Sequence, residues 1–332
     1  MDQNRRWRLI ATGIVLLAVG GLLVRASLQP CAWLDRALRR SGCLGTLVEQ
    51  DAAVISVAFS PDGTLLAVGF RDGRLALWNA GERRLRRTLE APLTSETDAY
   101  SYDVAFSPDG RILAHGLPDG TIRLWDVEDS RLVGTLGEGS GSVVSLGFSP
   151  DSRTLAAGTG RGPVQLWQMT DGTLLRTMEG HTNDVVGVVF SPDGTIIASA
   201  SLDGTVRVWD ESSGALIHEL ETRPVTTGVA FSPDGTILAT GRRLWRVDGW
   251  IPVGTMESIR GGMGNVAFSP NGELLAAGNA WREVRFWRVP EGELVSAVKV
   301  HKDSVNAVAF SADGEDLASG SLDGSVKLWR VP

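Results

Sequence analysis

The sequence predicts an all-β fold made from one repeated unit. Seven phenylalanines recur at a period near 42 residues, and a serine and a turn of the Pro-Asp-Gly type follow each of them. A tryptophan comes nineteen residues after six of these phenylalanines and fourteen residues after the fifth. The last unit is one strand short, and a segment ahead of the first unit supplies that strand. These three observations predict a seven-bladed β-propeller of four-stranded antiparallel sheets, preceded by one N-terminal transmembrane helix. The landmark pairs are Phe59 and Trp78, Phe106 and Trp125, Phe148 and Trp167, Phe190 and Trp209, Phe231 and Trp245, Phe268 and Trp287, and Phe310 and Trp329.

The helix is predicted from the first segment of the chain. Leu9–Val24 is sixteen residues without a charge, with three arginines shortly before it and one directly after it. Sixteen residues are slightly fewer than the roughly 17 to 25 that span a bilayer, but flanking arginines extend the reach of such a helix. A cleaved signal peptide and a buried helix are the alternatives, and "VRAS" is a poor cleavage site. We expect residues 1–25 to form a basic N-terminus and a transmembrane anchor, residues 26–42 a linker, and residues 43–332 the propeller.

The only two cysteines, Cys31 and Cys43, bracket the short segment between the predicted anchor and the propeller. Such a pair suits a disulfide in an oxidising compartment, although two free thiols in the cytosol would leave the same sequence. Arginines flank the apolar segment on both sides, so the positive-inside rule gives no orientation. The cysteine pair therefore favours a single-pass membrane protein whose propeller is extracytoplasmic. Residues 32–40 have apolar and arginine positions at helical spacing, which fits a short helix at the membrane surface or a helical linker.

The unit itself reads as four strands, here called a to d. In the fourth copy these are residues 185–190, 195–200, 205–209 and 215–220, which are rich in β-branched residues and separated by turn residues. One such sheet is apolar on both faces, so it must stack against copies of itself. Seven copies in a ring bury both faces of every sheet.

The two ends of the repeat predict that the ring is closed. The seventh unit stops at "VKLWRVP", after strand c, with no residues left for strand d. The segment "CLGTLV", Cys43–Val48, precedes the first strand a and matches "LVGTLG" at residue 132 and "LLRTME" at residue 174. The N-terminal strand is therefore expected to complete the last blade.

These units resemble the WD-repeat (Trp-Asp repeat) β-propeller family across residues 43–332. The resemblance rests on a histidine in the loop entering the unit, a Ser-x-x-x-Asp on the second hairpin, and a tryptophan ending strand c. In the family these residues form a hydrogen-bond relay, so the resemblance implies a structural role for them. Two units carry the full set, with identical spacing: His181, Ser199, Asp203 and Trp209, and His301, Ser319, Asp323 and Trp329.

Other units depart from the family pattern. Arg161 and Trp281 replace the acid, and the Trp-Asp pair survives only at Trp125-Asp126 and Trp209-Asp210. We expect blades without the relay to be locally looser.

Several functional classes are disfavoured by composition and spacing. The net charge is −7, and residues 46–332 alone carry 25 basic and 37 acidic residues, which argues against nucleic acid as a ligand. A catalytic Ser-His-Asp triad is expected once in a chain. Here the Ser, His and Asp residues occur twice at identical spacing, each time with a tryptophan, which disfavours catalysis. The four histidines have no nearby cysteine, and the Pro-Asp-Gly turns offer one carboxylate each. We expect no enzyme activity, no metal and no cofactor.

The irregular positions predict a binding face. In a meander, the a–b and c–d turns share one face of the disc, while the b–c turns and d–a loops share the other. The a–b turns are uniform, whereas aromatic residues and arginines cluster in the b–c turns and d–a loops, as at binding hot spots. Neutral drift of these loops is the alternative. The candidate partner-binding residues are Arg71, Tyr100, Tyr102, Arg161, Arg223, Arg242, Met263, Trp281 and Arg282.

The sequence thus predicts a membrane-anchored scaffold that binds an unknown protein or peptide through the face of the d–a and b–c loops. A small-ligand sensor or propeller enzyme that uses the central channel is the alternative. A surviving fragment of a larger signalling chain is a third hypothesis.

Overall fold

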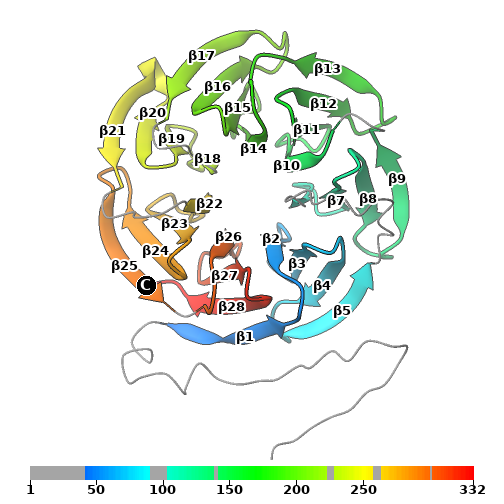
Figure 1. Ribbon diagram of the computed structural model, residues 1–332, viewed down its shortest axis with the longest axis vertical. Helices are drawn as coiled ribbons and strands as arrows, with labels where there is room; N and C mark the ends of the chain where they lie inside the picture. The colour runs from blue at the N-terminus through cyan, green and yellow to red at the C-terminus, as the bar shows by residue number, and fades with distance from the viewer. Residues whose placement is uncertain (1–41, 90–102, 138–140, 223–227, 257–262, 300) are drawn as a thin grey trace, which may run out of the picture.

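The protein is a ring of seven four-stranded antiparallel sheets, or blades, seen end-on in Figure 1. This computed structural model describes residues 42–89, 103–137, 141–222, 228–256, 263–299 and 301–332. In each blade strand a is innermost and strand d is outermost (Figure 1). The predicted all-β, seven-bladed propeller is therefore confirmed.

The first three blades follow the order of the chain. Blade 1 comprises β2 (Val54–Phe59), β3 (Leu65–Phe70), β4 (Leu75–Asn79) and β5 (Arg84–Leu89). Blade 2 comprises β6 (Val104–Phe106), β7 (Ile112–Gly116), β8 (Ile122–Asp126) and β9 (Leu132–Leu136). Blade 3 comprises β10 (Val143–Phe148), β11 (Thr154–Thr159), β12 (Val164–Gln168) and β13 (Leu174–Met178).

The remaining blades differ mainly in their turns. Blade 4 comprises β14 (Val185–Phe190), β15 (Ile196–Ser201), β16 (Thr205–Asp210) and β17 (Leu216–Glu221). Blade 5 comprises β18 (Val229–Phe231), β19 (Ile237–Thr240), β20 (Arg243–Arg246), the 3-10 turn η3 (Asp248–Trp250) and β21 (Ile251–Thr255). Blade 6 comprises β22 (Met263–Phe268), β23 (Leu274–Asn279), β24 (Glu283–Arg288) and β25 (Glu293–Lys299). Blade 7 comprises β26 (Val305–Phe310), β27 (Asp316–Ser321), β28 (Ser325–Arg330) and β1 (Cys43–Glu49).

The ring closes through the N-terminal strand, as the sequence predicts. β1 pairs antiparallel with β28, and the order of this sheet is β1-β28-β27-β26. Val48 lies opposite Val326, and both side chains are buried. The Arg330 backbone N–H donates to the Gly42 carbonyl (2.6 Å), which extends the pairing by one residue. Backbone hydrogen bonds therefore join the two ends of the repeat.

The hydrophobic core lies between the blades. One cluster packs Leu66 and Trp78 of blade 1 against Val326 and Leu328 of blade 7, together with Val48. Six further clusters join the other neighbouring pairs of blades in the same way. Each sheet therefore buries both faces against its neighbours, which is why the unit is stable only as a ring.

The Pro-Asp-Gly turns are built by their own side chains. In blade 1 the Thr64 N–H donates to Asp62 Oδ1 (3.0 Å), the Leu65 N–H donates to Ser60 Oγ (2.9 Å), and Gly63 has φ +71°. The equivalent pair of bonds occurs in all seven a–b turns. The acids of these turns therefore hold the turn itself.

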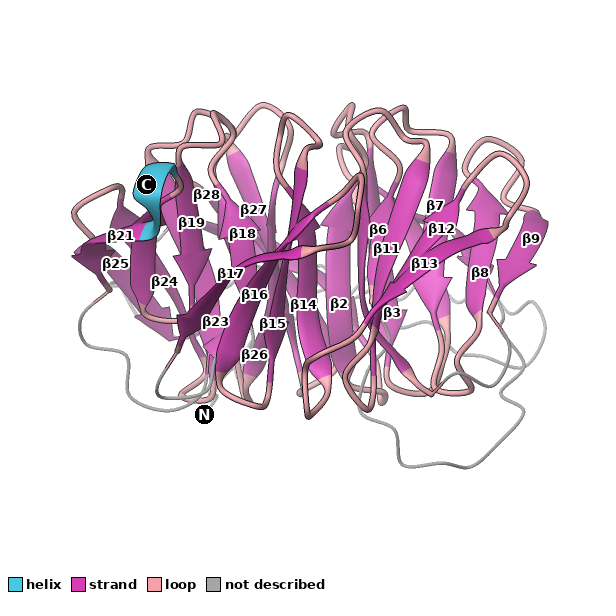
Figure 2. Cartoon of the chain, turned by 90° about the horizontal axis from the view of Figure 1, so that it is seen from above, coloured by secondary structure: helices cyan, strands magenta, loops and turns pink. Residues whose placement is uncertain are grey.

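Two faces of the disc carry the loops (Figure 2). The 3-10 turn η3 and the C-terminal end lie on the upper face in this view, which is the face of the a–b and c–d turns. The b–c turns lie on the opposite face. Met263 was expected in a loop of that face, but it is the first residue of β22, because pairing with Asn279 extends the strand. That expectation was wrong.

The predicted anchor, residues 1–25, lies outside the described residues. Among the residues that are described, no helix has the length and apolar character needed to cross a membrane.

Candidate partner-binding face

The relay of blade 4 is a chain of hydrogen bonds inside the sheet. The Trp209 indole N–H donates to Ser199 Oγ (2.8 Å), which lies 2.8 Å from His181 Nε2. His181 Nδ1 lies 2.9 Å from Asp203 Oδ2. With Nδ1 protonated, Ser199 donates to Nε2, and the indole, hydroxyl and imidazole are all satisfied. Asp203 also accepts from the Thr182 backbone N–H (3.0 Å), which ties the b–c turn to the loop that enters the blade.

Blade 7 repeats this chain with one difference. The Trp329 N–H donates to Ser319 Oγ (2.8 Å), and Ser319 Oγ lies 2.7 Å from His301 Nε2. His301 Nδ1 lies 2.9 Å from Ser325 Oγ and 3.4 Å from Asp323 Oδ2, so a second hydroxyl stands between the imidazole and the acid. The geometry of both sets connects strands b and c to the entering loop.

The electrostatics of the relay favour a neutral imidazole beside an ionised acid. Burial lowers the pKa of both His181 and His301, and the nearby carboxylates offset this only in part. Burial opposes ionisation of Asp203, but hydrogen bonds from Thr205, His181 and the Thr182 backbone prevail and hold its pKa at about 2. Both imidazoles are 0% exposed. A substrate has no access to them, which fits a role in the scaffold.

Blade 5 keeps the bond between the tryptophan and a hydroxyl, although it has no histidine or aspartate of the relay. The sequence alone did not reveal this bond. Ser199 lies two residues beyond Ile197, the register partner of Trp209. The equivalent position in blade 5 is Thr240, and the Trp245 N–H donates to its Oγ1 (2.7 Å). The shortened hairpin therefore retains its hydroxyl, although the spacing from hydroxyl to tryptophan is five residues instead of ten.

The other four blades have no hydroxyl at this position. The residues there are Val68, His115, Ala157 and Ala277. The indole N–H groups of these blades find no hydrogen-bond acceptor among the described residues; they belong to Trp78, Trp125, Trp167 and Trp287. The looser packing expected for these blades stays a prediction.

His115 gives blade 2 a pH-dependent stability. It is fully buried, and burial followed by the charge of Arg123 lowers the pKa of its imidazole to about 4, from 6.5. As the pH falls, the unfolded chain binds this proton first, so stability is lost between about pH 6.5 and pH 4. Between pH 7 and pH 5 the titration of His115 should lower the free energy of unfolding by about 2 kcal/mol. Urea unfolding of the wild type and a His115→Gln variant at both pH values checks this, because the variant should lose about 2 kcal/mol less. An equal loss in both proteins would contradict it.

An inner ring of hydrogen bonds between blades also escaped sequence analysis. In four blades the side chain three positions before the repeat phenylalanine accepts from a backbone N–H of the next blade. Ser145 Oγ accepts from the Val188 N–H (3.1 Å), and Asn265 Oδ1 accepts from the Val308 N–H (2.7 Å). The residues at this position in the seven blades are Ser56, Asp103, Ser145, Gly187, Gly228, Asn265 and Ala307.

Asp103 makes four contacts in this ring. Its carboxylate accepts from the hydroxyls of Ser56 (2.7 Å) and Ser145 (3.2 Å) and from the backbone N–H groups of Val104 (2.9 Å) and Leu146 (2.9 Å). Burial raises the pKa of Asp103, against the effect of these donors. The partners belong to blades 1, 2 and 3, so a single carboxylate joins three blades beside the central channel.

Trp281 is the most prominent feature of the opposite face. It lies in the b–c turn of blade 6, and 55% of its surface is exposed, more than any other large hydrophobic residue that the structure describes. The turn is braced from below by buried Asn279, whose Oδ1 accepts from the N–H groups of Trp281 (2.9 Å) and Glu283 (3.1 Å). The indole is thus presented on a turn whose backbone is fixed.

Arg282 occupies a strained backbone position in the same turn. Its φ is +71°, a left-handed conformation that costs a non-glycine residue roughly 1–2 kcal/mol. Strain of this kind recurs at functional sites. At the equivalent position five other blades have a glycine with positive φ: Gly73, Gly120, Gly162, Gly204 and Gly324.

Five arginines lie in the described b–c turns, and one of them, Arg74, is paired with Asp72 (2.6 Å). Arg161, Arg242 and Arg282 lie in b–c turns and form no ion pair with any described residue, and Arg71 lies exposed in the b–c turn of blade 1. On the face of the a–b and c–d turns, by contrast, four arginines contact an acid: Arg111, Arg131, Arg153 and Arg330. The b–c face therefore offers guanidinium groups to an external acceptor.

The remaining sequence predictions fall outside what the structure describes. Tyr100, Tyr102, Arg223 and Cys31 are not among the described residues, and only the backbone of Cys43, the first residue of β1, is described. In the described part of the chain, no group of three His, Cys, Asp or Glu side chains is arranged to hold a metal ion.

Comparison with protein families agrees with the geometry. The family model "WD domain, G-beta repeat" matches residues 41–79, 85–126, 172–210, 214–253, 250–288 and 292–330. These six matches cover well over half of the chain, and most of blade 3 lies in the unmatched segment 127–171, where the turn and the acid depart from the pattern. No curated protein matches the chain significantly. On the family match and the seven-bladed ring, the chain belongs to the WD-repeat β-propeller family.

Proposed function

We propose that this propeller is a membrane-anchored scaffold that binds a protein or peptide on the face of its b–c turns and d–a loops. WD-repeat propellers are typically interaction scaffolds and are usually not catalytic. The observation that carries the proposal is Trp281, an exposed indole on a braced turn beside the strained Arg282. Exposed tryptophan and arginine on a rigid support are the composition of interaction hot spots, because little side-chain or loop entropy is lost on binding.

The alternative proposal places a catalytic or small-ligand site in the central channel. The composition of the innermost strands does not favour it. Between their bounds, strands β2, β6, β10, β14, β18, β22 and β26 contain no acidic, basic, histidine or cysteine residue. Asp103, the carboxylate directly before β6, is occupied by four donors of the protein itself. General acid or base chemistry needs a titratable group within reach of a substrate, so the channel is the weaker candidate.

Capture from a detergent extract tests the binding face. Trp281→Ala and Arg242→Ala should each reduce recovery of a partner about tenfold or more, as expected for hot-spot residues. Neither side chain holds the ring together, so the melting temperature should stay within about 2 °C of the wild type. Arg153→Ala removes an exposed arginine from the other face and is the matched control. Unchanged recovery with both binding-face variants would remove this surface from consideration.

The membrane part of the proposal rests on the sequence of Leu9–Val24 and its flanking arginines. The cysteine pair supports an extracytoplasmic propeller. An impermeant thiol reagent applied to intact cells should label Cys31 and Cys43 only after reduction. Labelling that appears only after the cells are lysed would place the propeller on the cytosolic side.

A further inference from the structure

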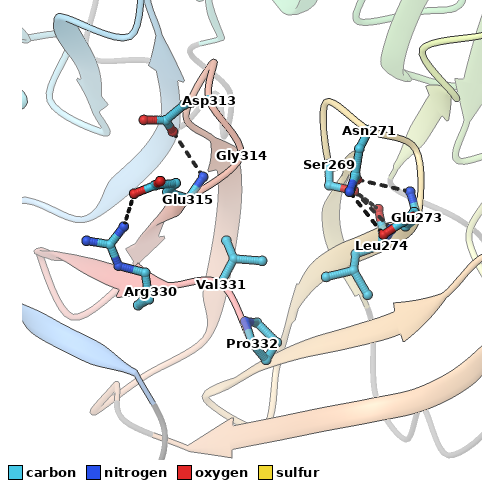
Figure 3. A pocket seen from close by; sticks show the side chains of 10 residues that line it. All are labelled: Ser269, Asn271, Glu273, Leu274, Asp313, Gly314, Glu315, Arg330, Val331 and Pro332. Carbon is cyan, nitrogen blue, oxygen red and sulfur yellow. Dashed lines mark hydrogen bonds and ion pairs between the residues drawn. The ribbon is translucent and has the colours of Figure 1, made fainter.

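A polar pocket of about 330 Å³, here called the seam pocket, lies between blades 6 and 7 at the end of β28, the strand that pairs with β1 (Figure 3). Its walls come from the a–b turns of blades 6 and 7, from the last residue of β28 and from the two residues that follow it (Figure 3). Glu273, Asp313 and Glu315 place three carboxylates in this lining, and Arg330 supplies one guanidinium, which is paired with Glu315. Asp316 lies next to the lining, 3.4 Å from Arg330. The pocket is therefore acidic even after this ion pair is counted.

Two of the three acids in this pocket, Glu273 and Glu315, occur only in blades 6 and 7, whereas Asp313 is the ordinary turn aspartate. Glu273 and Glu315 both follow the glycine of an a–b turn, in neighbouring blades. No other blade has an acid there: the residues that follow the turn in blades 1 to 5 are Thr64, Arg111, Arg153, Thr195 and Thr236. The fold of the turn does not require glutamate, because Thr64 makes the same backbone bond to its turn aspartate. The backbone of the turn therefore does not account for the two glutamates, whose carboxylates contact the Asn271 amide (3.1 Å) and the Arg330 guanidinium, respectively.

The N-terminal segment enters the propeller beside this pocket. In blade 2 the Asp126 N–H donates to the Arg131 carbonyl, and the c–d turn connects these two residues. In blade 7 the Arg330 N–H makes the equivalent bond to the Gly42 carbonyl. Gly42 thus stands where a c–d turn ends in the other blades, and the chain before it starts next to Arg330, a residue of the pocket wall.

The segment that precedes Gly42 is basic. Residues 33–41 read "WLDRALRRS", with three arginines and one aspartate. We propose that this segment docks across the seam pocket, with its arginines against Glu273, Asp313 and Glu315. Exposed ion pairs are individually weak, but a segment tethered directly at Gly42 has an effective concentration in the millimolar range, so weak contacts suffice. The docked segment would take the place of the missing c–d turn and would fix the chain leading to residues 9–24. This inference does not depend on the proposed binding function.

Trypsin cleavage of the full-length protein in detergent tests the docking. Cleavage after Arg36, Arg39 and Arg40 is followed by mass spectrometry of the new chain ends. The variant Glu273→Thr/Glu315→Thr carries the residue of blades 1, 4 and 5 at both positions, so its fold should be kept. Because proteolysis tracks the undocked population, cleavage in this variant should be roughly tenfold faster than in the wild type. High salt should speed cleavage of the wild type towards the rate of the variant, since screening weakens the same contacts.

The control variant is Arg111→Thr/Arg153→Thr, which introduces the same residue at the same turn position in blades 2 and 3. Its cleavage after residues 36–40 should match the wild type. Equal cleavage in the wild type and the glutamate variant would overturn the proposal and leave the pocket to a separate basic ligand. Partner capture through Trp281 should be unaffected by either variant, because it concerns the opposite face; failure of one proposal is thus distinguishable from failure of the other.

Discussion

Val48→Asp should lower the free energy of unfolding by about 3–5 kcal/mol, because it buries an unpaired charge in the strand that closes the ring. Val48 is 3% exposed and faces Val326, which is 0% exposed. The core between blades 7 and 1 includes both residues. In blade 7, strand d is joined to strand c only through hydrogen bonds and packing. Loss of this packing should therefore release β1 and open the ring.

Hydrogen exchange distinguishes opening of the ring from ordinary destabilisation. Leu136→Asp is the matched control, since Leu136 occupies the equivalent buried position of blade 2 and its strand stays attached through a c–d turn. Val48→Asp should remove protection from β1, β28 and the facing strands of blade 1 together. Leu136→Asp should affect blades 2 and 3, which it contacts. The same local pattern in both variants, each confined to its own outer strand, would argue against closure by β1.

Asp103→Ala should lower the free energy of unfolding by about 3 kcal/mol, because it removes a buried hydrogen-bond acceptor. The change leaves the Ser56 and Ser145 hydroxyls and the Leu146 N–H without their acceptor, and all three residues are buried. Each unsatisfied buried group costs about 1–3 kcal/mol, and removal of the buried charge offsets part of the sum.

A conservative variant separates the hydrogen bonds from the charge. Asp103→Asn keeps an oxygen acceptor for Leu146 and avoids the cost of burying a carboxylate. It should therefore lower the free energy of unfolding by only about 1 kcal/mol. Ser145→Ala removes one donor to Asp103 and also the acceptor of the buried Val188 N–H, so it should lower the free energy of unfolding by about 2 kcal/mol. Chemical unfolding of the three variants measures these differences. An Ala variant as stable as the Asn variant would show that Asp103 does not join the blades.

The fold could be predicted closely because the signals repeat. Residues 185–190 were expected as strand a and form β14, and Cys43–Val48 was expected as the closing strand and forms β1 with one further residue. Seven copies of one spacing leave few alternative arrangements, since each sheet needs neighbours on both faces.

The contacts between blades were harder to predict, because they depend on register rather than on a motif. Ser56, Asp103, Ser145 and Asn265 share one position, but their chemistry differs and three blades lack a polar side chain there. An alignment of the units on phenylalanine would have revealed them. Thr240 was missed because a shorter hairpin changes its spacing from Trp245, while the pairing of the strands keeps the two side chains together.

Some residues of the candidate binding face could be predicted from the sequence, and the reason is physical. Trp281 and Arg282 stand out in sequence because they replace the aspartate and glycine of a regular turn, and their exposure and positive φ follow from that replacement. The seam pocket was not readable, because Glu273 and Glu315 are ordinary turn residues until the ring brings blades 6 and 7 together at the entry point of the chain.

The most direct test of the binding face is site-specific photo-cross-linking in cells. A photoreactive phenylalanine analogue placed at Trp281 should give a discrete cross-linked species that contains a second protein. The same analogue at Arg153, on the face of the a–b turns, should give none. A cross-linked partner at Arg153 and none at Trp281 would contradict the account.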